Sequence, residues 1–355
     1  MEPFRKAELF LRRRLDETVC GERVTTVREC MKECQVSKAV VDRAAVFLQG
    51  ERLLEIRPRS GLYKPAEKTM KKPLAILLHF QRINFDNRSF HGDVMYYLSR
   101  EFSRRGWDLE IHTMSCESDP GPVVNDLTER KNVDCVIAVS VAYHDMKYIE
   151  QFQRSGIRVL LLFPNMAETM PGSLNMDDAA IVRLQLEHLT DAGIRKIAFL
   201  HAVEENRYIR SQNRRLEAFC RQIPEFQLQV RPEWICNIGW FPDTIQPAVR
   251  ALLAAKNRPE ALIVNDAQAG SVYAAIRQMK LSIGEDISIV GCDDLEYVKY
   301  FDPPLATVAI DRQQIAAHLC RLIEQPDFSG AEFIRLEFKA RPSIRRNALV
   351  FADRH

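Results

Sequence analysis

The feature that most constrains the fold is an alternation of short apolar runs with longer amphipathic stretches, which begins at about residue 73. The apolar runs have the length of buried strands, and the intervening stretches have helical spacing. This alternation favours an α/β fold with a mostly parallel sheet. Roughly 270 residues are many for one doubly wound sheet, so the pattern predicts two lobes around a cleft. The predicted strands are 74–80, 109–114, 135–141, 159–163, 196–200, 261–265 and 288–292, and the predicted helices are 92–105, 146–155, 179–192, 212–222, 245–255 and 270–279.

The first 65 residues follow a different pattern, with three helical segments and then two short β-like runs. The interval between the second and third helices is only a few residues, and the β-like runs are joined by Pro-Arg-Ser-Gly, a hairpin signal. This order predicts a winged helix-turn-helix, whose third helix would enter the major groove of DNA. The expected elements are a helix over 4–19, a helix capped by Thr25 or Thr26 and ending near Cys34, a helix from Ser37 to Gly50, and β-like runs over 53–57 and 61–64.

Charge is distributed unevenly between these two parts of the chain. Residues 1–72 contain 17 Lys and Arg against 11 Asp and Glu, a net charge of +6, whereas residues 73–355 contain 33 against 37, a net charge of −4. A basic head on a mildly acidic body favours a polyanionic partner for the head. The expected domains are therefore a DNA-binding head over 1–65, a polar linker over 66–72, a sensor over 73–345 and a tail over 346–355. We expect the chain to cross between the sensor lobes near residues 192, 292 and 322.

The head carries a set of residues in the register of a known family. These are Arg28-Glu29, Val36-Ser37-Lys38, Ala44, Leu48, Glu51 and Leu53-Leu54, and together they resemble the GntR-type winged helix. The resemblance implies that Arg28, Ser37, Lys38 and Val40 face DNA and that Ser60 and Gly61 bring the wing towards the minor groove. Arg and Lys can bind phosphates or guanine edges, and Gly61 permits a tight turn.

Two positions of the recognition helix depart from the GntR pattern. Val40 stands where the family has Thr, and Asp42 stands where it has Arg. An acidic side chain repels phosphate but can accept a hydrogen bond from a cytosine amino group. A winged helix used for protein contacts is the alternative for this head.

Seven sequence signatures follow one another in the sensor in the order found in LacI/GalR-type repressors. The sensor therefore resembles the effector domain of that family, which is similar to periplasmic sugar-binding proteins. The resemblance covers about three quarters of the chain. The signatures are Asn175-Met176-Asp177-Asp178, the stretch from His188 to Ala198 containing Gly193-Ile194-Arg195, Arg215-Leu216-Glu217-Ala218-Phe219, Asn265-Asp266, the stretch from Gly284 to Asp294, Pro303-Pro304-Leu305-Ala306-Thr307-Val308 and Arg341-Pro342-Ser343.

The LacI/GalR resemblance implies an effector site. Asp178, Arg215 and Asp266 match positions that bind effector hydroxyls, and Trp240 resembles a position where an aromatic ring packs on a sugar face. Carboxylates and a guanidinium suit vicinal hydroxyls, and an aromatic ring suits a C–H face. Simpler roles remain open, because Asp266 could cap a helix, Arg215 could be an exposed charge, and Trp240 could belong to the core.

Two further questions concern the same site. Asp177 competes with Asp178 for the implied role, since the two are adjacent. The loop after the first predicted strand lies where open α/β sheets bind ligands, and it adds Phe80, Gln81 and Arg82 as candidates.

Several classes of protein are disfavoured. The chain has no G-x-S-x-G, P-loop, H-E-x-x-H or G-x-G-x-x-G motif, so we expect neither an enzyme nor a bound cofactor. Nine scattered cysteines without a C-x-x-C pair favour buried free thiols over a metal site. No apolar run is long enough for a membrane span and the N-terminus has no signal-peptide pattern, so we expect a cytoplasmic protein.

These observations predict a homodimeric repressor whose operator DNA affinity is controlled by a small-molecule effector, which the family resemblance implies to be a sugar. LacI-type proteins usually have a hinge helix between head and sensor, but residues 65–72 have no apolar helical pattern. We therefore expect coupling through placement of the heads. The alternative is a cytoplasmic sugar-binding module that acts through protein partners without binding DNA.

Overall fold

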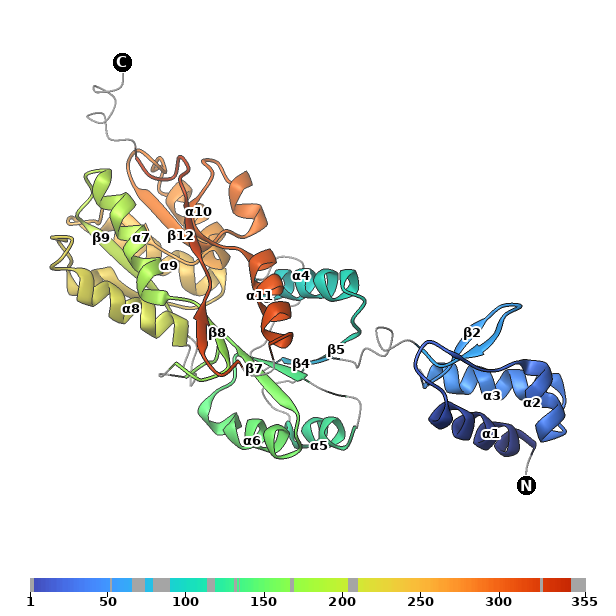
Figure 1. Ribbon diagram of the computed structural model, residues 1–355. Helices are drawn as coiled ribbons and strands as arrows, with labels where there is room; N and C mark the ends of the chain where they lie inside the picture. The colour runs from blue at the N-terminus through green and yellow to red at the C-terminus, as the bar shows by residue number, and fades with distance from the viewer. Residues whose placement is uncertain are drawn as a thin grey trace, which may run out of the picture. The chain divides into compact units, whose positions relative to one another are not determined.

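The structure is a computed structural model that describes residues 3–51, 53–65, 74–78, 90–113, 119–130, 133, 135–166, 169–203, 210–325 and 328–345. The chain divides into two compact units, Met1–Lys72, here called the head, and Pro73–His355, here called the sensor (Figure 1). The predicted linker over 66–72, the loop with Phe80, Gln81 and Arg82, and the tail over 346–355 lie outside the described residues.

The head contains the predicted three helices and hairpin, with one additional strand. Thr26 caps the second helix with a complete capping box, because its side chain accepts from the backbone N–H of Glu29 while the Glu29 carboxylate accepts from that of Thr26. Leu11, Leu48 and Leu62 pack in one core. The strands form an antiparallel sheet in the order β1-β3-β2. The elements are α1 (Pro3–Glu17), β1 (Arg23–Thr25), α2 (Val27–Cys34), α3 (Lys38–Gly50), β2 (Glu55–Arg57) and β3 (Gly61–Tyr63).

The described residues of the sensor form two six-stranded sheets, and the sheet that contains the first of these strands, β4, defines lobe I. Its strand order is β14-β8-β7-β6-β4-β5, and all neighbouring pairs are parallel. Helices α4 and α11 cover one face, and α5 and α6 cover the other (Figure 1). The elements are β4 (Leu74–Leu78), α4 (Phe90–Arg104), β5 (Leu109–Thr113), α5 (Gly121–Glu129), β6 (Cys135–Val139), α6 (Met146–Arg154), β7 (Arg158–Leu162), β8 (Ser173–Asn175), α11 (Arg312–Ile323) and β14 (Ala331–Phe333).

Lobe II is built on the second sheet, in the order β10-β9-β11-β12-β13-β15, which is parallel except for the last pair. Helices α7 and α8 pack on one face and α9 and α10 on the other, so both faces are apolar. The elements are α7 (Asp178–Asp191), β9 (Ile197–Ala202), α8 (Arg210–Gln222), β10 (Ile235–Ile238), α9 (Pro242–Ala254), β11 (Ala261–Ile263), α10 (Asp266–Gln278), β12 (Ser288–Asp293), β13 (Ala306–Ile310) and β15 (Leu336–Lys339).

The positions at which the chain passes between the lobes differ from those expected near 192, 292 and 322. The crossings lie between β8 and α7, between β13 and α11, and between β14 and β15. The error arises because β8 and β14 have only three residues each, too short for a periodic signal. Without these two short strands, the extent of lobe I could not be read from the sequence.

Candidate functional site

A cluster of buried polar side chains lies at the carboxyl ends of the lobe II strands. Asn265 follows β11, Arg215 projects from α8, and Asp178 is the first residue of α7. All three are at least nine-tenths buried. Polar groups are rarely buried without partners, so the arrangement of their bonds defines this site. We call these three residues, with Gln212 and Gln268, the polar cluster.

Arg215 lies at the centre of the polar cluster. Its Nε donates to Oδ1 of Asp178 at 3.0 Å, and its Nη1 donates to Oδ1 of Asn265 at 3.1 Å. Burial lowers the pKa of Arg215, but Cys292 and Asp178 outweigh burial and raise that pKa overall. Burial raises the pKa of Asp178, and the charge of Arg215 opposes that rise. The cluster thus holds a permanent guanidinium charge beside a carboxyl group in a low-dielectric environment.

Side-chain amides extend the polar cluster to the turn that carries Trp240. Nδ2 of Asn265 donates to Oε1 of Gln212 at 3.0 Å and to Oε1 of Gln268 at 3.1 Å. Nε2 of Gln268 then donates to the backbone oxygen of Gly239 at 2.7 Å. Trp240 follows in sequence and is half-buried, and its buried Nε1 has no acceptor among the described residues. A buried indole N–H without a partner is a donor that a bound molecule can satisfy.

Asp266, predicted to contact the effector, has a different set of partners. It is fully buried as the first residue of α10. Its Oδ2 accepts from the backbone N–H of Leu295 at 3.0 Å, and its Oδ1 accepts from the hydroxyl of Thr307 at 2.9 Å. A Cβ atom at Gly291 would lie 1.9 Å from Oδ1, so the glycine makes room for this carboxylate. Asp266 therefore ties α10 to the turn after β12 and to β13.

The competing residue Asp177 has a structural role as well. It is the N-cap of α7, and its Oδ1 accepts from the backbone N–H of Ala180 at 2.9 Å. Asp178, in contrast, directs its carboxylate to Arg215. The geometry thus separates the two neighbouring acids, and Asp178 is the member that belongs to the polar cluster.

Arginine contacts surround the turn after β12, and two of the residues involved, Arg312 and Asp93 of lobe I, were not singled out from the sequence. Nη2 of Arg312 donates to Oδ2 of Asp93 at 3.2 Å and to the backbone oxygen of Asp294 at 2.8 Å. Nη2 of Arg341 donates to Oδ1 of Asp294 at 2.6 Å. Asp293 and Asp294 have φ values of +112° and +52°. A conformation that is uncommon for residues with side chains is thus held by two arginines. The Asp-Asp pair and the Arg-Pro-Ser signature were visible in the sequence, but their contact was not.

The head presents its predicted DNA-facing side chains in several environments. Arg28, Ser37, Lys38 and Ser60 are exposed, whereas Val40 is half-buried. Ser37 is the N-cap residue of α3, but its side chain makes no capping hydrogen bond and is therefore available to another partner. The hydroxyl of Ser60 lies 2.7 Å from that of Tyr63.

Asp42 of α3 and Gly61 of the β2–β3 hairpin each have a local explanation. Asp42 lies 3.9 Å from Lys38 in an exposed i,i+4 ion pair, which offsets its charge. Gly61 has φ +130°, and a Cβ there would lie 3.0 Å from the backbone oxygen of Thr25. Only glycine fits this turn without strain.

No group of His, Cys, Asp and Glu that could hold a metal ion occurs among the described residues. Cys30 and Cys34, spaced as a helical pair, are both buried, and burial together with Cys34 raises the pKa of Cys30 to about 12. No helix within the described ranges is long and apolar enough to cross a membrane.

Comparison with known proteins agrees with this architecture. A periplasmic binding protein-like domain model matches residues 186–325. The transcriptional repressor PurR of Mannheimia succiniciproducens is 23% identical over 244 residues, covering 66% of this chain and 70% of that protein. A CelR–cellobiose complex has a TM-score of 0.65 at 16% identity, covering 87% of this chain and 92% of that one. The lac repressor dimer bound to operator and the anti-inducer ONPF has a TM-score of 0.63 at 20% identity, covering 77% and 94%.

The chain is similar to the PurR and LacI transcriptional repressors. Its sensor is periplasmic-binding-protein-like, as predicted, and the relatives are repressors rather than enzymes. The family model matches within the sensor, so it supports no assignment of the head to the GntR type.

Proposed function

We propose that the regulator is a homodimeric repressor that binds operator DNA through its heads and releases it in response to a sugar-like effector bound between the sensor lobes. The observation that carries the proposal is the polar cluster, with the indole N–H of Trp240 beside it, which has no acceptor in the part of the chain that the structure describes. It lies at the carboxyl ends of parallel strands, where open α/β sheets bind ligands. The repressor relatives support the same function.

The chemistry of the polar cluster favours a neutral, hydroxyl-rich effector. The Arg215 charge is already matched by Asp178 at 3.0 Å, so an anionic ligand would have to compete with a buried carboxylate. Amides and an indole can bind hydroxyls, and the aromatic ring of Trp240 can cover a C–H face. In this proposal, Asp178, Arg215 and Trp240 serve effector binding, and Asp266 positions α10 beside them.

For the head, we propose more specifically a GntR-type winged helix over residues 1–65. The exposed Arg28 and Lys38, together with Ser37 at the start of α3, would contact DNA, and the turn at Ser60 and Gly61 would form the wing. Two heads of a dimer would bind the two halves of a pseudo-palindromic site. Effector binding and DNA binding would then be reciprocally coupled.

Operator binding is tested with a DNA fragment from the regulator's own upstream region, by gel shift or fluorescence anisotropy over a series of salt concentrations. We expect sequence-selective binding that weakens as salt rises. Lys38→Ala should weaken it, whereas Lys32→Ala, which removes an exposed charge from α2, should have little effect. Absence of selective binding at low salt would instead favour the sensor module that acts through protein partners.

Effector binding is tested by a thermal-shift screen of the full chain over neutral sugars, sugar acids and glycosides, because a ligand that binds the folded state stabilises it by an amount that grows with the ratio of ligand concentration to Kd. For a ligand found in the screen, Trp240→Phe should weaken binding roughly three- to tenfold, the equivalent of one neutral hydrogen bond. Trp107→Phe, which removes an indole N–H in lobe I, is the control. Equal affinity in both variants would contradict the role of Trp240.

A further inference from the structure

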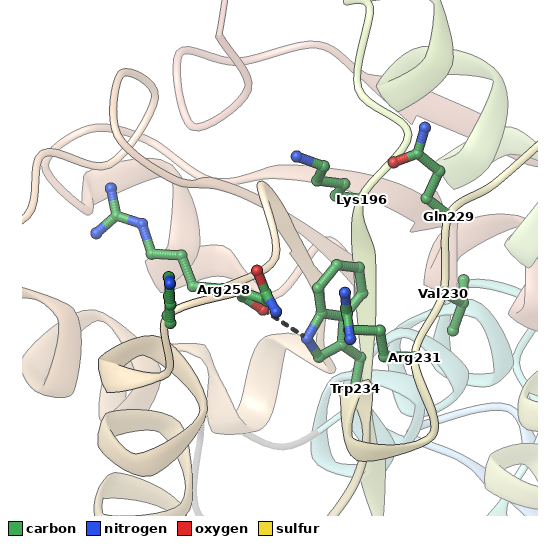
Figure 2. Close-up of a pocket in the computed structure, with 8 residues that line it drawn as sticks. Lys196, Gln229, Val230, Arg231, Trp234 and Arg258 are labelled. Atoms are coloured by element: carbon green, nitrogen blue, oxygen red, sulfur yellow. Dashed lines mark hydrogen bonds between the residues drawn. The ribbon is translucent and has the colours of Figure 1, made fainter.

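A pocket with a volume of about 380 Å³ lies in lobe II, and the charged side chains that line it are all basic (Figure 2). Lys196 directly precedes β9, Arg231 and Trp234 lead into β10, and Lys256 and Arg258 precede β11. Strands β10, β9 and β11 are neighbours in the sheet. The lining therefore comes from the amino ends of three adjacent strands. We call this space the basic pocket.

The basic pocket is separate from the polar cluster. The polar cluster lies at the carboxyl ends of the same strands, where Asn265 follows β11. β9 spans six residues, Ile197–Ala202, so the two edges of the sheet are ~17 Å apart at about 3.3 Å per residue. A ligand in the basic pocket would not touch the proposed effector site.

The charges around the basic pocket are largely unneutralised. Four of its eight lining residues are Lys or Arg and none is acidic. The guanidinium of Arg231 forms an exposed ion pair with the carboxylate of Glu233 at 3.8 Å. Lys196, Lys256 and Arg258 have no carboxylate within salt-bridge distance among the described residues. Like charges around one cavity repel one another, so a bound anion would relieve that repulsion.

The floor of the basic pocket is a fixed aromatic ring. Trp234 is only 2% exposed, and its Nε1 donates to the backbone oxygen of Asn257 at 3.1 Å. The Arg231 guanidinium lies 5.9 Å from the ring centroid, and Figure 2 shows its side chain beside the indole. Because the indole donor is already bonded, Trp234 can offer a ligand only its apolar ring surface.

We propose that the basic pocket binds a small molecule that bears a phosphate or diphosphate group. Arg231 and Arg258 can each bind a phosphate through paired N–H donors, while Lys196 and Lys256 add positive charge. The edge of the Trp234 ring would contact the remainder of the ligand, and the volume is within the range of small-ligand sites. The regulator would thereby respond to an anionic metabolite at a second site, independently of the effector.

The test uses the full chain labelled with 5-fluorotryptophan and followed by fluorine NMR during titration with inorganic pyrophosphate at constant ionic strength. The chain has three tryptophans, all in the sensor, so the basic head contributes no signal. We expect pyrophosphate to shift the Trp234 resonance in a saturable way while those of Trp107 and Trp240 stay in place. Resonances are assigned with single Trp→Phe variants.

Two matched double variants distinguish specific binding of pyrophosphate in the basic pocket from general attraction of an anion to positive charge on the protein. Lys196→Ala/Arg258→Ala should weaken pyrophosphate binding at least tenfold. Arg221→Ala/Arg335→Ala removes the same charge from exposed positions outside the pocket and should change it less than twofold. Equal weakening by both pairs, or no Trp234 shift at millimolar pyrophosphate, would overturn the proposal. Lys196→Gln/Arg258→Gln repeats the test should the alanine pair fail to fold.

Discussion

Replacement of Arg215 by alanine should destabilise the sensor far more than loss of an ordinary surface arginine. Asp178 and Asn265 would lose their bonds to the guanidinium at 3.0 and 3.1 Å, and Asp178 is only 7% exposed. Breaking a buried ion pair by removing one partner costs about 3–5 kcal/mol. We therefore expect the free energy of unfolding of the sensor to fall by about that amount.

The matched control is Arg183→Ala. Arg183 binds both carboxylate oxygens of Glu225, at 2.6 and 2.7 Å, but its side chain is 44% exposed and that of Glu225 is 51% exposed. Exposed pairs contribute about 0–1 kcal/mol because water and side-chain entropy offset the attraction. The two variants remove the same kind of side chain and differ mainly in burial.

Urea unfolding followed by tryptophan fluorescence measures this difference directly, since Trp107, Trp234 and Trp240 all belong to the sensor. A double variant, Arg215→Met/Asp178→Leu, should regain part of the stability lost by Arg215→Ala, because no buried charge is then left without a partner. The reasoning would be refuted if Arg215→Ala destabilised the sensor no more than Arg183→Ala does.

Three further predictions concern other sites. Gly291→Ala places a Cβ 1.9 Å from the Asp266 carboxylate and should cost about 1–3 kcal/mol in urea unfolding, whereas Gly270→Ala, also in the sensor and with the nearest atom 3.7 Å from the new Cβ, should cost nothing. Burial, followed by the charge of Asp293, raises the pKa of Asp266, so the folded state holds this proton more tightly than the unfolded state. The Asp266 contribution to the free energy of unfolding should therefore fall as pH rises above about 4, by at most about 1.4 kcal/mol per pH unit. Urea unfolding at a series of pH values measures this dependence, and Asp266→Asn should make it weaker. Lys38→Ala should reduce the salt slope of operator binding by about one, measured by anisotropy, if this side chain contacts a phosphate; an unchanged slope would exclude that contact.

Much of the sensor could be predicted because its buried parallel strands are continuous apolar runs. β6 (Cys135–Val139) is buried at every position and agrees closely with its predicted range. The short strands β8, β14 and β15 could not be predicted, since three or four residues carry no period and their pairing is decided by distant segments. Helix α10 begins at Asp266, four residues earlier than predicted, because tertiary bonds to Leu295 and Thr307 hold its first turn.

The residues of the candidate site could be chosen from the sequence, but their partners could not. Motif spacing identified Arg215 and Asp178, and the structure joins them across 37 positions of sequence. The same motifs gave Asp266 a ligand role, although it is fully buried and bonded to the protein. Sequence spacing shows where a charged side chain starts, whereas burial and neighbouring donors decide what it binds.

The contacts of Asp266 also suggest how an event at the polar cluster can reach lobe I. Asp266 follows Asn265 of the polar cluster directly and accepts from the N–H of Leu295. Leu295 follows Asp294, whose backbone oxygen accepts from Arg312, and Arg312 donates in turn to Asp93 on α4. This route crosses between the lobes through the turn at which two consecutive aspartates have positive φ. Because two arginines hold this turn, it joins Asn265 to α4 by a continuous series of bonded groups, which is the physical connection that coupling between the lobes would need.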